Sequence, residues 1–191
     1  LEALSKTAPE LALEHGVVEA CSKLVAAHPR NPAIADPATG ILHAIASALP
    51  ENAADLNAPK PCIVVLERAP TYYAADDDPA MTRAVVNALK VLEKVGDPLR
   101  LAKQGAVSAV FDAVEAKADD PNVVIQAERT LRVLLAERDA LAVLDKLKRV
   151  DLGKIKIGNP SAMRVANAAV SRLGLLMMCG LFLPTIQANG G

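Results

Sequence analysis

The feature that most constrains this chain is a recurring dipeptide, an Asp or Asn followed by Pro. It occurs at spacings of 42, 42 and 39 residues, at Asp36-Pro37, Asp78-Pro79, Asp120-Pro121 and Asn159-Pro160. The Asx side chain accepts hydrogen bonds from free backbone N–H groups of a first helical turn. Pro suits the first helical position, where no N–H is needed. Each dipeptide therefore predicts the start of a long helix.

A second recurring pattern places a turn residue shortly after a Pro. The pairs, seven residues apart except for the last at six, are Pro9 and Gly16, Pro50 and Asn57, Pro98 and Gly105, and Pro184 and Gly190. Gly, and next to it Asn, tolerates the left-handed φ of a helix-ending turn. Each pair predicts a short helix, a sharp turn and then a second helix, expected at 17–27, 61–69 and 106–117 and more weakly at 140–150.

Apolar residues keep the same places in each predicted long helix. Six, ten and thirteen residues after the Pro stand Val85, Leu89 and Leu92, then Ala127, Leu131 and Leu134, then Ala166, Val170 and Leu173. Steps of four and three residues place such side chains on one helix face. The first predicted long helix, 36–49, fits less well, because His43 falls at the first of these places.

The cysteines fit the same repeating pattern. Five residues after the turn residue, Cys21 and Cys62 occupy the place that Val110 occupies in the third predicted unit. This equivalence predicts small buried side chains rather than redox or metal chemistry. Three cysteines without a CxxC motif, and three histidines without a matching acid or Cys, predict no metal site, no cofactor and a reducing compartment.

The composition agrees with closely packed helices. The chain is 52% hydrophobic but only 2% aromatic, whereas a β-sandwich is rich in β-branched and aromatic residues. A formal net charge of −1 gives no electrostatic reason to expect nucleic acid or an anionic membrane as a partner. The expected fold class is therefore all-α.

The sequence resembles the armadillo-repeat family in three respects. These are the three-helix unit of about 42 residues, the Gly turn between the first two helices, and the Ala-xxx-Leu-xx-Leu pattern of the third helix; residues 12–21 and 101–111 match best locally. The resemblance implies a right-handed α-solenoid, with units at 1–49, 50–95, 96–135 and 136–180 and a fifth beginning at 181–191. It also implies a segment of a longer array, and HEAT repeats are the close alternative.

Armadillo proteins bind extended peptides or partner proteins along the face lined by their third helices, so the resemblance implies candidate partner-binding residues. They are Arg83, Asn87, Arg129, Arg164 and Arg172. Importin-α-like members carry a row of Trp and a row of Asn on this face. Neither row is present, so binding of nuclear-localisation signals is not expected. The arginines predict a weakly basic strip for acidic side chains, and the alternative is an ordinary solvated helix face.

Catalytic motifs are not found in the sequence. There is no GxSxG, no HExxH and no Cys with a positioned His. The preferred hypothesis is a non-catalytic scaffold for protein–protein contacts, a structural piece of a larger cytoplasmic assembly such as a cytoskeletal or ciliary complex. The alternative is a peptide receptor that uses the basic strip.

A third hypothesis comes from the apolar stretch 165–183. It suggests a membrane-associated helical protein, but Arg172 near its middle is costly in a bilayer. A buried core helix is therefore favoured over a membrane span.

Overall fold

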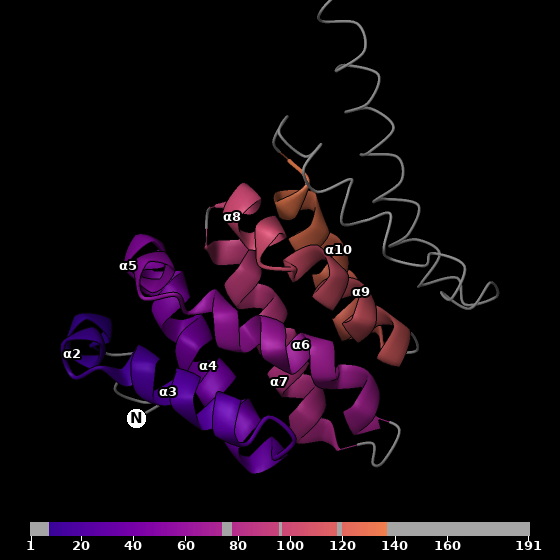
Figure 1. Cartoon of the computed structure of the whole chain (residues 1–191), viewed down its shortest axis with the longest axis horizontal. Coiled ribbons are helices and arrows are strands. Elements are labelled where there is room, and N and C mark those ends of the chain that lie inside the picture. The colour runs from indigo at the N-terminus through magenta and orange to yellow at the C-terminus, as the bar shows by residue number, and fades with distance from the viewer. Residues whose placement is uncertain (1–7, 74–77, 96, 118–119, 137–191) are drawn as a thin grey trace, which may run out of the picture.

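The computed structural model describes residues 8–73, 78–95, 97–117 and 120–136, and within them every regular element is an α-helix. The all-α prediction is confirmed for this part of the chain (Figure 1). In order, the helices are α2 (Pro9–Glu14), α3 (Val17–Ala27), α4 (Pro32–Ala48), α5 (Pro50–Asp55), α6 (Pro59–Tyr73), α7 (Pro79–Lys94), α8 (Pro98–Lys103), α9 (Ala106–Ala116) and α10 (Pro121–Leu134).

Proline marks the start of most of these helices. Seven of the nine in the described ranges begin with it. At α7 the carboxylate of Asp78 accepts a hydrogen bond of 2.8 Å from the Ala80 N–H. At α10 Asp120 accepts one of 2.8 Å from the Asn122 N–H. The prediction that Asx-Pro opens the long helices at these two places is confirmed, because the side chain caps the turn that Pro begins.

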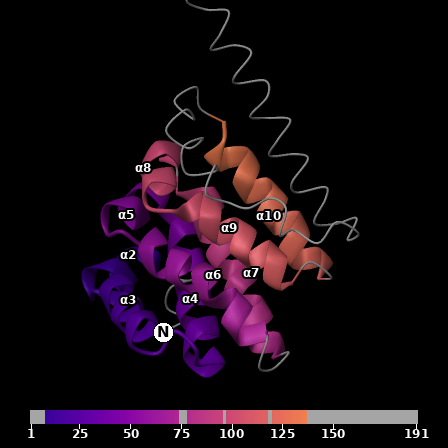
Figure 2. The same ribbon diagram turned by 45° about the vertical axis from the view of Figure 1, so that its right-hand side comes forward.

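The helices pack in two rows. In chain order the described helices fall into three groups, which are α2 to α4, α5 to α7 and α8 to α10. The second helices of these groups form one row, in which α3 packs on α6 and α6 on α9. The third helices form the other row, in which α4 packs on α7 and α7 on α10. Figure 2 shows both rows, and in both views the short helices α2, α5 and α8 lie along one edge. Segments about forty residues apart in sequence are therefore neighbours in space.

The predicted left-handed turns are confirmed where the structure describes them. Gly16 and Gly105 have φ of 66° and 94°, and Asn57 has φ of 59°. The Asn57 side chain has a further role that the sequence pattern does not indicate. Its Oδ1 accepts hydrogen bonds from Arg100 Nη2 of α8 at 3.4 Å and from Nε2 of Gln104, the residue just after α8, at 3.3 Å. The turn between α5 and α6 is thus joined to the next short helix.

The predicted start of the first long helix is wrong. Helix α4 begins at Pro32, and the Asn31 side chain caps it by accepting a hydrogen bond of 3.1 Å from the Ala33 N–H. Pro37 lies inside the helix. Its missing N–H removes only the hydrogen bond to the carbonyl of Ala33. Because Ala33 is an exposed residue of the first turn, this loss does not stop the helix, which continues past Pro37. Asn31-Pro32 is itself an Asx-Pro dipeptide, and the correct start lies five residues earlier.

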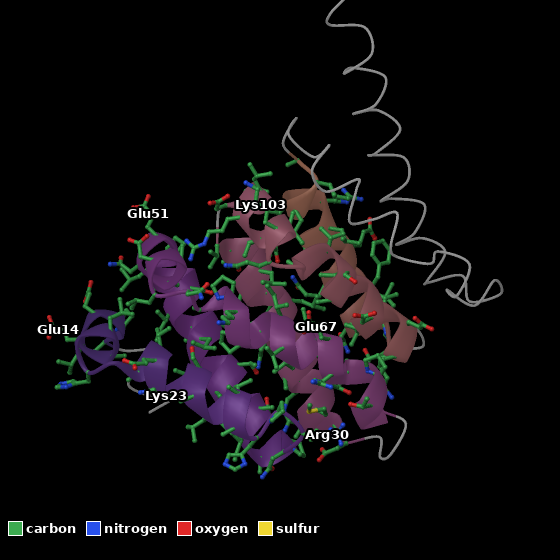
Figure 3. All side chains as sticks on the ribbon, viewed as in Figure 1. Glu14, Lys23, Arg30, Glu51, Glu67 and Lys103 are labelled. Atoms are coloured by element: carbon green, nitrogen blue, oxygen red, sulfur yellow. The ribbon has the colours of Figure 1, made fainter. Side chains whose placement is uncertain are left out.

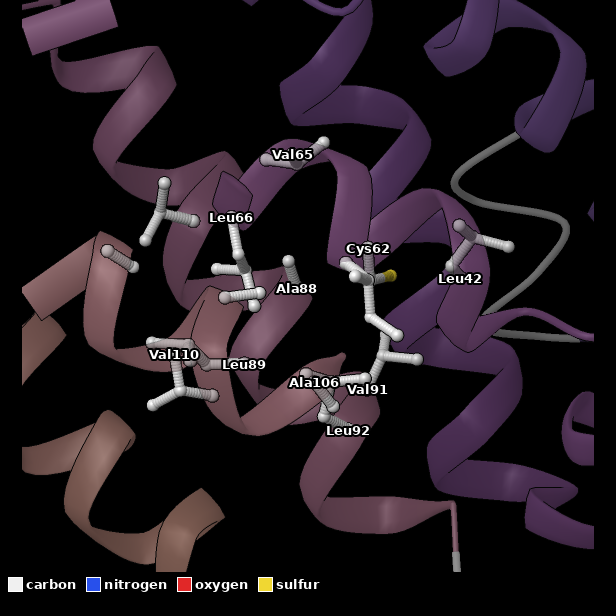
Figure 4. Packing of buried hydrophobic residues seen from close by; sticks show 14 of the residues in the cluster. Leu42, Cys62, Val65, Leu66, Ala88, Leu89, Val91, Leu92, Ala106 and Val110 are labelled. Atoms are coloured by element: carbon white, nitrogen blue, oxygen red, sulfur yellow. The ribbon is translucent and has the colours of Figure 1, made fainter. Parts of the chain in front are cut away.

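This correction brings the first unit into line with the others. Counted from Pro32, the residues at six, ten and thirteen are Ala38, Leu42 and Ile45, and all three are buried. The corresponding residues of α7 and α10 are also buried: Val85, Leu89, Leu92, Ala127, Leu131 and Leu134. Figure 4 shows Leu42, Leu89 and Leu92 within the same packed core as Cys62. The predicted apolar stripe is therefore confirmed, and the misfit of His43 came from the wrong start.

Helix α6 is longer than the predicted 61–69. It begins at Pro59 and continues past Pro70 to Tyr73. Pro70 removes one backbone hydrogen bond near the end of the helix, and the hydroxyl of Thr71 donates to the Arg68 carbonyl at 2.7 Å. A proline in the last turn therefore does not end this helix.

The predicted burial of the cysteines is confirmed for two of them. Cys21 is 4% exposed and Cys62 is fully buried, as is Val110 at the equivalent place. Burial raises the pKa of the Cys21 thiol to about 11. Burial likewise raises the pKa of Cys62, with nearby Cys21 as a smaller cause.

Several predictions concern residues beyond those described. These are the long helix at Asn159-Pro160, the stripe of Ala166, Val170 and Leu173, the turn at Gly190, Cys179, and the apolar stretch 165–183. Among the helices that are described, none combines the length and the apolar character that crossing a membrane requires.

The turn glycines and a helical glycine should respond oppositely to alanine. Replacing Gly16 or Gly105 should lower the free energy of unfolding by about 1 kcal/mol, because an L-residue is strained at positive φ. A Cβ at Gly16 would meet nothing within 4 Å, and one at Gly105 only Glu67 Oε1 at 3.8 Å, so steric clashes contribute little. Urea denaturation followed by circular dichroism measures both variants.

Gly40→Ala is the matched control. Gly40 lies inside α4, and a Cβ there would contact Asn87 Nδ2 at an ordinary 3.6 Å. Alanine should raise stability by about 0.5–1 kcal/mol through helix propensity. The same sign of change in all three variants would contradict the assigned turn geometry.

Candidate interaction surface

Three of the five predicted partner-binding residues lie on described third helices. We define the third-helix face by the fourth and eighth residues after each helix-opening Pro, which are Asp36 and Gly40 of α4, Arg83 and Asn87 of α7, and Ile125 and Arg129 of α10. Because α4 packs on α7 and α7 on α10, residues at equivalent places come side by side. The structure thus brings Arg83, Asn87 and Arg129 onto neighbouring helices.

Arg83 is engaged in an ion pair that spans two helices. Its Nε and Nη2 lie 2.8 Å and 2.7 Å from Oδ2 of Asp36. The Arg83 side chain is 62% exposed and that of Asp36 is 19% exposed. Arg83 therefore contributes little net positive charge to the face, which is less basic than the arginines alone predict.

Asn87 and Arg129 occupy the second line of the third-helix face. Asn87 is half-buried and lies close to Gly40, whose lack of a side chain leaves room for the amide. Arg129 is exposed on α10, and Ile125 one turn earlier is 43% exposed. This part of the face combines a cation with an apolar side chain. Arg164 and Arg172 lie outside the described residues.

Polar contacts between α7 and α10 were not anticipated from the sequence. The buried hydroxyl of Thr130 lies 3.0 Å from the Leu89 carbonyl of α7 and 2.9 Å from the Gln126 carbonyl of its own helix. Gln126 Nε2 donates to Glu93 Oε2 at 2.5 Å. Thr130 and Gln126 lie beside the apolar stripe of α10, and both are buried. Because buried polar groups need hydrogen-bond partners, polar residues next to the stripe are the sequence signal for such contacts.

An acidic group lies on the second-helix row. It consists of Glu67 of α6 and of Asp112 and Glu115 of α9. Glu67 is labelled in Figure 3. Burial raises the pKa of Asp112, and repulsion from Glu115 and Glu67 adds to the effect. In the described ranges no cluster of His, Cys, Asp and Glu is arranged to hold a metal ion. The group is thus a local electrostatic cost, relieved when Asp112 binds a proton.

Comparison with known proteins adds no relative. Neither the scan against protein-family models nor the searches of curated proteins and solved structures found a match.

The Asp36–Arg83 pair should show measurable coupling. In a double-mutant cycle of Asp36→Asn and Arg83→Gln, we expect about 0.5 kcal/mol of interaction energy in the free energy of unfolding. High salt should reduce it, because the pair is partly exposed. The matched cycle of Asp36→Asn with Arg129→Gln should give no coupling, and equal coupling in the two cycles would contradict the pairing.

Asp112→Asn should stabilise the protein at neutral pH. Because the folded-state pKa of Asp112 is raised above its unfolded value, the ionised carboxylate destabilises the fold at higher pH. This cost is relieved as pH falls through the folded pKa, so the gain from Asn should shrink in acid. Urea midpoints of both proteins across pH 4–8 test this, with Asp55→Asn as an exposed control. A gain that is constant with pH would contradict the assignment.

Proposed function

We propose that the chain forms a right-handed, armadillo-like α-solenoid that acts as a non-catalytic scaffold for protein–protein contacts. The observation that carries this proposal is the repetition of equivalent packing. Three groups of a short, a second and a third helix follow one another, and residues at equivalent places are buried in each. Such stacked units expose extended surfaces rather than one enclosed pocket, which suits a scaffold.

Between the two forms of scaffold, we favour a structural subunit of a larger assembly. A receptor for acidic peptides needs uncompensated cations along the third-helix face, and Arg83 is already paired with Asp36. We propose a cytoplasmic setting, such as a cytoskeletal or ciliary complex, in keeping with free, buried cysteines at positions 21 and 62.

The peptide-receptor function is the second candidate, and one observation favours it. Arg129 is exposed beside the exposed Ile125, a pairing of a cation and an apolar side chain that suits an acidic peptide with one hydrophobic residue.

A partner census with charge-reversed variants separates the two candidates. The full-length chain, and the same chain carrying Arg129→Glu and Arg172→Glu, are used as baits for quantitative co-purification. A structural subunit should retain one stoichiometric set of partners in both baits. A groove receptor should lose partners that share an acidic motif when the arginines are reversed. A Leu89→Asp bait, whose core charge unfolds the chain, is the control for non-specific capture. Recovery of the same proteins with this control would contradict the scaffold proposal.

A further inference from the structure

A wide apolar groove lies between α3 and α4 on the side turned away from α6 and α7. It encloses about 710 Å³ and includes Ala20, Cys21 and Leu24 of α3 and Ile34, Pro37 and Ile41 of α4. Cys21 and Ile41 are buried in its floor, whereas Leu24 is 47% exposed at its rim. Among the described residues that line it there is no Asp, Glu, Lys or Arg.

The same surface is covered in both following helix pairs. The residues equivalent to these six are Pro61, Cys62, Val65, Met81, Ala84 and Ala88 in α6 and α7, and Ala109, Val110, Ala113, Val123, Gln126 and Thr130 in α9 and α10. All twelve are buried. In the second pair the helices that pack on this side are α3 and α4, and in the third they are α6 and α7.

The groove therefore repeats, on a side of α3 and α4 where no described helix pair packs, the interface that joins each described pair to the next. Its chemistry is close to that of the covered surfaces, because its described lining consists of small and aliphatic side chains with one imidazole, that of His15. We propose that it is a docking site for a partner protein of helical-repeat construction, which presents a packed helix pair like α3 and α4. The inference rests on the proposed repeat architecture and names one surface of the scaffold and the kind of partner that fits it.

A tandem chain tests whether the groove accepts such a pair. Residues 9–49 are repeated once in the full-length chain, so that the second copy follows Leu49 at its Pro9, as Pro50 does naturally. Covalent linkage supplies the helix pair at high effective concentration. Leu24→Glu is then placed in either the upstream or the downstream copy, and urea unfolding is measured for each.

The two copies are matched controls for one another. In the upstream copy no added helix pair lies against Leu24, so the midpoint should stay close to that of the unsubstituted tandem chain. In the downstream copy Leu24 should be covered, and a charge there should lower the folding equilibrium constant about tenfold or more. Should Leu24→Glu prevent folding altogether, the milder Leu24→Ser gives the same comparison. Equal effects in the two copies would overturn the proposal.

The natural chain provides the second measurement. In the partner census, Leu24→Glu should remove the docking partner at least tenfold, whereas Leu56→Glu should retain it, since Leu56 is 51% exposed outside this groove. Full retention by the Leu24 variant would overturn the docking site while leaving the scaffold function intact. Absence of any stoichiometric partner of the natural chain would instead contradict the scaffold function.

Discussion

The packing depends on the hydrogen bond that an Asn or Asp side chain accepts from the backbone N–H two residues later, at the start of each described third helix. This bond, with the Pro between its two partners, decides which residue is first in the helix. The cap sets where each helix begins, and the apolar side chains at steps of four and three residues then share one face along its length. A short polar contact at the surface thereby marks the first turn, while the spacing of the apolar residues determines which side chains become core.

Local chemistry was enough to predict the turns and most of the core. Gly16 and Gly105 adopt left-handed φ because no side chain opposes it, and Asn57 is the type that tolerates it next best. Leu89 and Leu131 are buried where the four-and-three spacing predicts a core face. These features depend on a few neighbouring residues, and such residues are visible in a single sequence.

Features that depend on tertiary packing were not predictable in the same way. Asn31-Pro32 and Asp36-Pro37 are chemically similar helix starts, and the burial of Leu42 against the neighbouring helices distinguishes them. The ion pair of Asp36 with Arg83 follows from that start, because only then do the two side chains occupy equivalent places on α4 and α7. Helix α6 likewise continues past the predicted end at residue 69, because a proline in the last turn removes one hydrogen bond without ending the helix.

The hydroxyl of Thr130 has a mechanical consequence. It joins the side of α10 to a backbone carbonyl of α7, a group whose position along the helix axis does not adjust as a side chain does. Sliding of one helix along the other would break this bond in a buried setting, where no water replaces it. Tilting about the contact preserves it. We therefore expect this contact to oppose a change in the offset of α10 along α7 more than a change in their crossing angle.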